Sequence, residues 1–213
     1  MELKKLKNFI WDFDGTLYDT YPYTIDCFIK ALNDTGYEAD RIEIYSLMMD
    51  TIEAAFRLYE EKYGIGARLR GAFKEIRKTD PLSQGGPFPY AVDVLERVIR
   101  NGGKNYMFTH RVNDVYEFME YWDTTKYFED IVTLADGFEP KPSPDAINYL
   151  IQKHCFDKSE TIMTGDREID VLSGANAGIY TCHITNNMPY NDFTADLRVG
   201  NLKDMLYMLE SGE

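Results

Sequence analysis

Two carboxylates stand two residues apart in the segment Asp12-Phe13-Asp14-Gly15-Thr16, which directly follows a short apolar run. In an extended chain, residues i and i+2 point to the same side, so we expect Asp12 and Asp14 to face one way and Phe13 to face the core. Gly15 permits a sharp exit from the strand. Paired carboxylates are suited to nucleophilic attack and proton transfer, although an ordinary Asp-Gly turn would have the same sequence.

Further polar residues follow other predicted strands. Thr109 ends an apolar run, and a hydroxyl in that place can bind a phosphate oxygen, while Lys141 lies between prolines that stiffen its loop. Asp166 and Asp170 follow another run, and a helix beginning near Asp166 would place both acids on one face. Each residue alone has a simpler reading as a turn hydroxyl, a solvated loop charge or a helix N-cap. Their occurrence at successive strand ends favours a single site that binds phosphate.

These residues need a scaffold that brings strand ends together. Short β-rich runs alternate with amphipathic helical patterns along most of the chain. The alternation predicts an α/β fold, a Rossmann-like three-layer core around a central, mainly parallel sheet. Open sheets of this kind bind ligands at the carboxyl ends of their strands. The predicted strands are 8–13, 105–109, 131–133, 161–164 and 179–184, and the predicted helices include 112–121, 144–154, 168–177 and 202–209.

One interval interrupts that alternation. From about residue 18 to 84 the apolar positions follow helical spacing, as Ile25 and Phe28 do. The interval closes at Asp80-Pro81 and at a Gly-Gly-Pro cluster, which is typical of a hinge, and a further helix begins near Pro89. We therefore predict a core domain of residues 1–17 and 86–213. A small all-helical cap domain, residues 18–85, is inserted after the first strand.

Composition excludes several classes of protein. The net charge of −13 disfavours nucleic acid and anionic lipid as partners. No apolar run is long enough to span a membrane. The apolar run that follows the N-terminal lysines is too short for a signal peptide. Cys27, Cys155 and Cys182 are scattered and odd in number, which predicts reduced thiols and a cytoplasmic protein. An acidic protein that binds phosphate must gather positive charge locally, through side chains or a metal.

The combination of signatures resembles the haloacid dehalogenase-like hydrolase superfamily. The chain has DxDGT at 12–16, a strand-end threonine at Thr109, Lys141 in a proline-rich loop and GDxxxD at 165–170. The helical insertion looks like the cap of the phosphoglycolate phosphatase and β-phosphoglucomutase subgroup. The resemblance covers nearly the whole chain, and its motifs are short singly but specific together.

The resemblance implies a Mg²⁺-dependent phosphomonoester hydrolase that acts on a small phosphorylated metabolite through an aspartyl-phosphate. Asp12 would be the nucleophile and Asp14 the acid/base. The same resemblance implies metal ligation by the Asp12 carboxylate, the Asp14 backbone carbonyl and Asp166, with Asp170 in support. Oxygen ligands without a His or Cys cluster suit Mg²⁺. Thr109 and Lys141 complete the expected catalytic set, and the candidate substrate contacts are Gly15, Thr109, His110, Arg111 and Lys141.

Other functions remain open at this stage. β-Phosphoglucomutases carry a cap histidine shortly after the first signature, whereas this chain has no histidine near Thr24, so water is favoured over a sugar hydroxyl as acceptor. A catalytically idle scaffold with the same fold is a further alternative. A response-regulator receiver uses similar residues but has no helical cap. Residues 18–85 contain no motif that identifies the substrate, and the sequence leaves monomer and homodimer both open.

Overall fold

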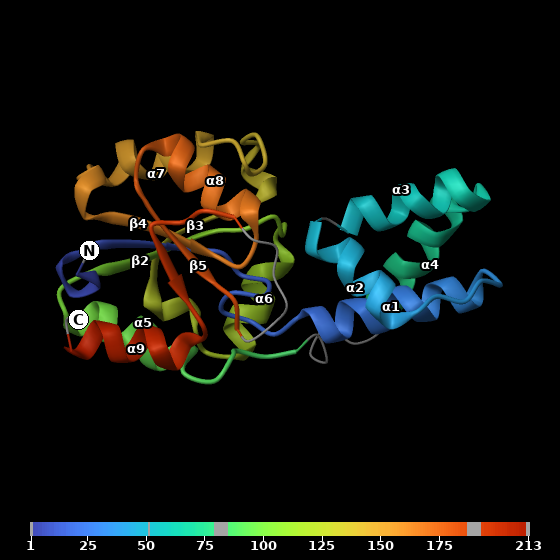
Figure 1. Ribbon diagram of the computed structural model, residues 1–213, viewed down its shortest axis with the longest axis horizontal. Coiled ribbons are helices and arrows are strands. Elements are labelled where there is room, and N and C mark those ends of the chain that lie inside the picture. Colours follow the sequence, from blue (N-terminus) through green and yellow to red (C-terminus); the bar gives the residue numbers. More distant parts are fainter. Residues whose placement is uncertain (1, 51, 79–84, 187–192, 212–213) are drawn as a thin grey trace. The chain divides into compact units, whose positions relative to one another are not determined.

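The structure is a computed structural model that describes residues 2–50, 52–78, 85–186 and 193–211 (Figure 1). It divides into two compact units. One comprises residues 1–19 and 86–213, and the other comprises residues 20–85. We call them the core unit and the helical unit. The predicted hinge at Asp80-Pro81 lies outside the described residues.

A six-stranded parallel sheet forms the centre of the core unit, in the order β3-β2-β1-β4-β5-β6. The predicted α/β fold with its parallel sheet is therefore confirmed. The strand β6 was not predicted, because it has three residues and carries an exposed arginine in its middle. The strands are β1 (Asn8–Trp11), β2 (Lys104–Phe108), β3 (Phe128–Val132), β4 (Thr161–Gly165), β5 (Tyr180–Ile184) and β6 (Leu197–Val199).

Helices cover both faces of this sheet, which gives three layers (Figure 1). Helices α5, α6 and α9 pack with Phe9 and Trp11 in one apolar cluster. Helix α7 and the end of α8 pack with Ile10 in a second cluster on the opposite face. Neighbouring residues of β1 enter different clusters because side chains alternate across a strand. The helices are α5 (Ala91–Arg100), α6 (Asp114–Tyr121), α7 (Asp145–His154), α8 (Glu168–Ala177) and α9 (Leu202–Ser211).

The helical unit has an apolar core of its own. Its centre is aromatic, with the Phe28 ring 5.2 Å from that of Phe56 and 6.0 Å from that of Phe73. Among the residues of this unit whose burial is described, none of the buried ones is charged. The helical character predicted for this interval is confirmed, and its function as a cap stays a prediction. The helices are α1 (Tyr21–Asp34), α2 (Arg41–Asp50), α3 (Ile52–Tyr63) and α4 (Gly66–Lys78).

Short 3-10 turns connect several elements of the core unit. They lie at Leu3–Lys5, Thr125–Tyr127, Leu134–Asp136 and Lys158–Glu160. None of the helices in the described ranges is both long enough and apolar enough to span a bilayer.

Candidate active site

The parallel sheet places the candidate residues at one edge. Strand β1 lies between β2 and β4, so Asp12, Thr109 and Asp166 follow three adjacent strands that run in the same direction. The amide of Asp12 still donates to the Thr164 carbonyl at 2.9 Å, and that of Thr109 to the Val132 carbonyl at 3.0 Å. Strand order reverses at β1, and α/β sheets bind ligands at such switch points.

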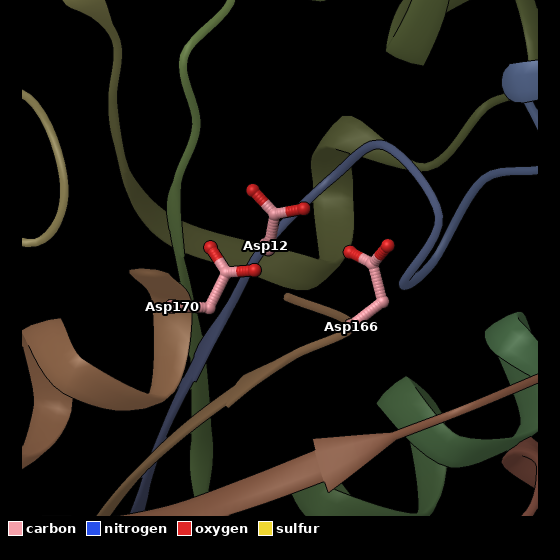
Figure 2. A group of neighbouring side chains, drawn as sticks. All are labelled: Asp12, Asp166 and Asp170. Carbon is pink, nitrogen blue, oxygen red and sulfur yellow. The ribbon is translucent and has the colours of Figure 1, made fainter. Parts of the chain in front are cut away.

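Three carboxylates meet at this edge (Figure 2). Asp12 follows β1, Asp166 lies in the turn after β4, and Asp170 is in the first turn of α8. Each offers an oxygen within 4.8 Å of the others, and all three side chains are buried. This is the only such acidic group in the part of the chain that the structure describes. Uncompensated charge in a buried position is unfavourable, so the cluster requires cations.

Lys141 supplies one of these cations. Its Nζ donates to Asp12 Oδ1 at 2.6 Å and to Asp170 Oδ1 at 2.7 Å, and its side chain is fully buried. Burial alone would lower the pKa of Lys141, but the carboxylates of Asp12 and Asp170 outweigh it and raise the pKa above its ordinary value. Lys141 is therefore a fixed positive charge beside the candidate nucleophile.

The cluster still carries an excess of negative charge. Asp170 is fully engaged, because its Oδ1 accepts from Lys141 and its Oδ2 accepts from the Arg167 amide at 3.0 Å. Asp12 Oδ2, in contrast, is buried and has no hydrogen-bond partner among the described residues. Burial raises the pKa of Asp12 from 3.8 to about 6, against the lowering effect of Lys141. A buried acceptor without a donor, beside further carboxylates, fits a bound divalent cation.

Asp166 lies in the turn that precedes α8. The helix predicted at 168–177 is confirmed, since α8 is Glu168–Ala177, so Asp166 is not on this helix and does not share a helical face with Asp170. Thr16 Oγ1 donates to Asp166 Oδ1 at 3.2 Å, and His183 Nε2 donates to the Asp166 carbonyl at 3.1 Å.

Gly165 explains how the turn and the helix approach so closely. A Cβ at this position would lie 2.2 Å from the Asp170 Cβ and 2.4 Å from its Cγ. Any larger residue would therefore displace Asp170 or the end of β4. The glycine of GDxxxD is required by the close packing of Asp170 against the strand.

Asp14 lies outside the buried cluster and forms an ion pair with Arg111. Arg111 donates from Nε to both Asp14 oxygens at 3.0 Å and from Nη2 to Oδ1 at 2.8 Å. Its Nη1 also donates to Asp114 at 3.0 Å, and its guanidinium lies 4.9 Å from the Phe13 ring centre. Phe13 is fully buried, as expected for a side chain that faces the core. The planar guanidinium holds the Asp14 carboxylate in one orientation.

Two further candidate residues follow β2. Thr109 is fully buried, and its Oγ1 accepts from the Arg111 amide at 3.1 Å, which leaves its hydroxyl proton for another acceptor. His110 is half-buried, and its Nε2 accepts from the Lys141 amide at 2.9 Å. His110 and Arg111 thus contact Lys141 and Asp14, and a contact of either with substrate stays a prediction.

Gly15 is in the left-handed region, with φ of 79°, and its carbonyl accepts a hydrogen bond from a residue far along the sequence. Asn186, just after β5, donates from Nδ2 to the Gly15 carbonyl at 2.7 Å and to the Thr16 carbonyl at 3.1 Å. Sequence reasoning did not include Asn186. The rule that found the other residues, a polar side chain after a parallel strand, would have included it.

Comparison with known proteins agrees with this arrangement. Residues 9–184 match the family described as haloacid dehalogenase-like hydrolase. The chain belongs to the haloacid dehalogenase-like hydrolase family. The matched range spans both units and contains all four sequence signatures.

Relatives of this family member include named phosphatases. The chain is 25% identical to the phosphoglycolate phosphatase of Vibrio parahaemolyticus, over 97% of each chain. It is 24% identical to the pyrophosphatase PpaX of Oceanobacillus iheyensis, over 94% of this chain and 95% of that one.

Solved structures share the fold of this hydrolase-family chain. A hydrolase from Streptococcus pneumoniae is 26% identical, with a TM-score of 0.62, and the match covers 90% of this chain and 95% of that one. A haloacid dehalogenase-like family protein from the same organism is 18% identical, with a TM-score of 0.77 over 95% and 98% of the two chains. At that identity, the second likeness concerns the fold alone.

Proposed function

We propose that this chain is a Mg²⁺-dependent phosphomonoester hydrolase that acts on a small phosphorylated metabolite through an aspartyl-phosphate intermediate. The observation that carries the proposal is the Asp12 carboxylate, which has one oxygen bound to Lys141 and the other without a hydrogen-bond partner in the described chain. An anionic nucleophile with an available oxygen, beside a fixed cation, suits attack on a phosphoryl group. The phosphatase names of the relatives support the reaction class.

Asp12 and Asp14 divide the chemistry between them in this proposal. Asp12 attacks phosphorus, so an Asp12 oxygen–phosphorus bond forms and the ester oxygen–phosphorus bond breaks. Asp14, in its protonated form, gives its proton to the departing alkoxide. Asp14 then takes a proton from the water that attacks the intermediate, which regenerates Asp12 and releases phosphate. The hydrogen bonds from Arg111 keep the Asp14 carboxyl group in place for both proton transfers.

The site has the donors that a magnesium ion prefers. The Asp12 carboxylate, the Asp14 backbone carbonyl and Asp166 would hold the ion. Asp170 would support them, since its own oxygens already accept from Lys141 and Arg167. When bound, Mg²⁺ offsets the repulsion between a carboxylate and an anionic phosphoryl group.

Charge that develops on the transferring oxygens needs further stabilisation. In the proposal, Lys141, the Thr109 hydroxyl and backbone amides next to Thr109 supply it. Lys141 is suited to this function because its buried ammonium is already aligned by two carboxylates, and little reorganisation is required when the phosphoryl group arrives.

Residues 18–85, which include the helical unit, are proposed to act as a cap that closes over the substrate and excludes bulk water. Thr24 in α1 bears on the choice between hydrolysis and transfer to a sugar. Its Oγ1 donates to the Thr20 carbonyl at 2.9 Å within its own helix. A hydroxyl used in this way is not a general base, which favours water as the acceptor over a sugar hydroxyl.

A phosphate-release assay tests the proposal. The full chain is incubated with Mg²⁺ and with phosphoglycolate, pyrophosphate, sugar phosphates and nucleoside monophosphates, and Asp12→Asn is assayed in parallel. We expect release from at least one phosphomonoester, dependence on Mg²⁺, and a covalent phosphoprotein that is trapped by acid quenching in the wild type only. Turnover that persists in Asp12→Asn would refute the nucleophile. No release from any compound would favour the idle scaffold.

A further inference from the structure

The loop that carries Lys141 has few backbone donors. Prolines at 140, 142 and 144 have no N–H, so the segment 140–144 offers only the amides of Lys141 and Ser143. The Ser143 amide donates to the Pro140 carbonyl at 3.0 Å and closes a turn within the loop. The Lys141 amide donates to His110 Nε2 at 2.9 Å. Of these two amides, the Lys141 amide is the one that bonds outside the loop.

The two ends of Lys141 are thus fixed by different partners. Its amide is held by His110, which follows β2, and its Nζ is held 2.6 Å from Asp12 and 2.7 Å from Asp170. Phe108 lies beside both residues, with its ring 4.8 Å from Lys141 Nζ and 6.3 Å from the His110 ring. A displacement of the Lys141 backbone would therefore move the ammonium away from the nucleophile.

The chemical state of His110 suits an acceptor. An imidazole nitrogen accepts a hydrogen bond only when it carries no proton, so Nε2 must be bare and the proton must lie on Nδ1. Burial, followed by the positive charges of Lys141 and Arg167, lowers the pKa of His110 to about 4. His110 is therefore neutral at physiological pH and available to the Lys141 amide.

We propose that His110 is a positioning residue that anchors the Lys141 backbone and so sets the ammonium between Asp12 and Asp170. The inference rests on the proposed function for the consequence in catalysis. It differs from the expectation that His110 contacts substrate, because the bond seen here runs to the catalytic loop. Loss of this bond would also leave a part-buried amide unsatisfied.

Substitutions at His110 separate anchoring from substrate contact. His110→Phe keeps a ring without an acceptor, and His110→Gln places an amide oxygen near the former Nε2. For His110→Phe we expect a fall in kcat of about 10- to 100-fold with KM changed less than about threefold. His110→Gln should recover most of kcat. A rise in KM with kcat unchanged, or equal losses in both variants, would overturn the proposal.

A double-mutant cycle tests whether His110 acts through Lys141. In the background of Lys141→Ala, His110→Phe should cause almost no further loss of kcat, because the group that it positions is absent. Two independent losses that multiply would overturn the proposal. Thermal unfolding of each variant shows whether the protein is folded.

A spectroscopic measurement is independent of activity and needs no substitution that risks the fold. The chain has 3 histidines, so ¹⁵N spectra of the imidazoles at neutral pH are simple to assign, with His110→Gln identifying the His110 signals. We expect the Nδ1–H tautomer with a bare Nε2, and the Nε2–H tautomer would overturn the anchor. If the wild type hydrolyses no phosphate ester, the proposed function fails while the tautomer still decides the anchor. Active enzyme with an unaffected His110→Phe variant refutes only the positioning.

Discussion

Each unit of the molecule contains an arginine that forms an ion pair with a carboxylate through two nitrogens and lies over a phenylalanine ring. In the core unit, Arg111 pairs with Asp14 and lies 4.9 Å from the Phe13 ring centre. In the helical unit, Arg70 pairs with Glu53 and lies 4.5 Å from the Phe56 ring centre. The exposed fractions differ: 7% and 27% for the Arg111 and Asp14 side chains, and 44% and 56% for Arg70 and Glu53.

The difference shows what burial adds to a common chemical motif. The exposed pair is screened by water and contributes little to stability. The partly buried pair fixes the orientation of both groups, and removal of either partner would leave the other charge desolvated and unpaired. The core unit uses buried charge around Asp12 as well, while the described buried residues of the helical unit are uncharged. The comparison therefore predicts that matched substitutions have large effects in the core unit and small effects in the helical unit.

The largest contrast concerns two aspartates. We expect Asp12→Asn to lower kcat by about 10⁴-fold or more, because the amide is a poor nucleophile for phosphorus. Asp26→Asn removes an aspartate from the exposed ion pair with Arg41 in the helical unit and should change kcat less than about threefold. Both are measured by steady-state phosphate release with saturating Mg²⁺. Similar losses in the two variants would contradict the contrast.

The two arginine pairs give the second contrast. Arg111→Met should lower the free energy of unfolding by roughly 2–4 kcal/mol, because it leaves Asp14 and Asp114 without their common cation. Arg70→Met removes an exposed ion pair with Glu53 and the guanidinium over the Phe56 ring, and should cost about 1 kcal/mol at most.

Tryptophan fluorescence during urea unfolding reports the stability of the core unit. Both tryptophans, Trp11 and Trp122, belong to the core unit, so their signal reports its unfolding. We expect Arg111→Met to move this transition to lower urea and Arg70→Met to leave it in place. A shift of equal size in both variants would show that burial does not separate the two pairs.

The same contrast explains what could be predicted from the sequence. The strands, and the polar residues that follow them, were visible because strand alternation and turn residues are local signals. The partner of Asp14 was not visible, because Arg111 lies 97 residues further along the chain. Helical spacing identified the helices of the helical unit, but apolar and aromatic core residues reveal packing and not chemistry.

One element was missed for a specific physical reason. The strand β6 was missed because Leu197–Val199 is short and only its last residue is buried. The helix predicted at 168–177 matches α8, Glu168–Ala177. The partner of Asp166 could not be predicted, because its carboxylate accepts from Thr16, 150 residues away in the sequence.

Two glycines extend the comparison, because replacement by alanine should destabilise the protein at one of them and stabilise it at the other. Gly165→Ala would place its Cβ 2.2 Å from the Asp170 Cβ, so we expect a loss of about 1–3 kcal/mol together with reduced activity. Gly71 lies within α4 with open space around the position of a Cβ, and Gly71→Ala should stabilise the helical unit by about 0.5–1 kcal/mol. Tryptophan fluorescence reports the first change and far-ultraviolet circular dichroism the second. Destabilisation by Gly71→Ala would contradict the open environment of that position.

The last contrast concerns stabilisation of the core unit by Mg²⁺. After treatment with a chelator, free Mg²⁺ at about ten times its Kd should stabilise the protein by about 1.4 kcal/mol at pH 7.5. Because burial raises the pKa of Asp12 to about 6, lowering the pH through 6 protonates this carboxylate, and protons then compete with the metal. The stabilisation should therefore shrink at pH 5, as measured by thermal unfolding followed by tryptophan fluorescence.

Asp166→Asn should abolish the stabilisation by Mg²⁺ at both pH values and Asp26→Asn should preserve it, since Asp166 belongs to the buried acidic cluster and Asp26 to an exposed ion pair. Equal Mg²⁺ stabilisation of these two variants would place the ion outside the cluster and remove the electrostatic basis for the difference between the units.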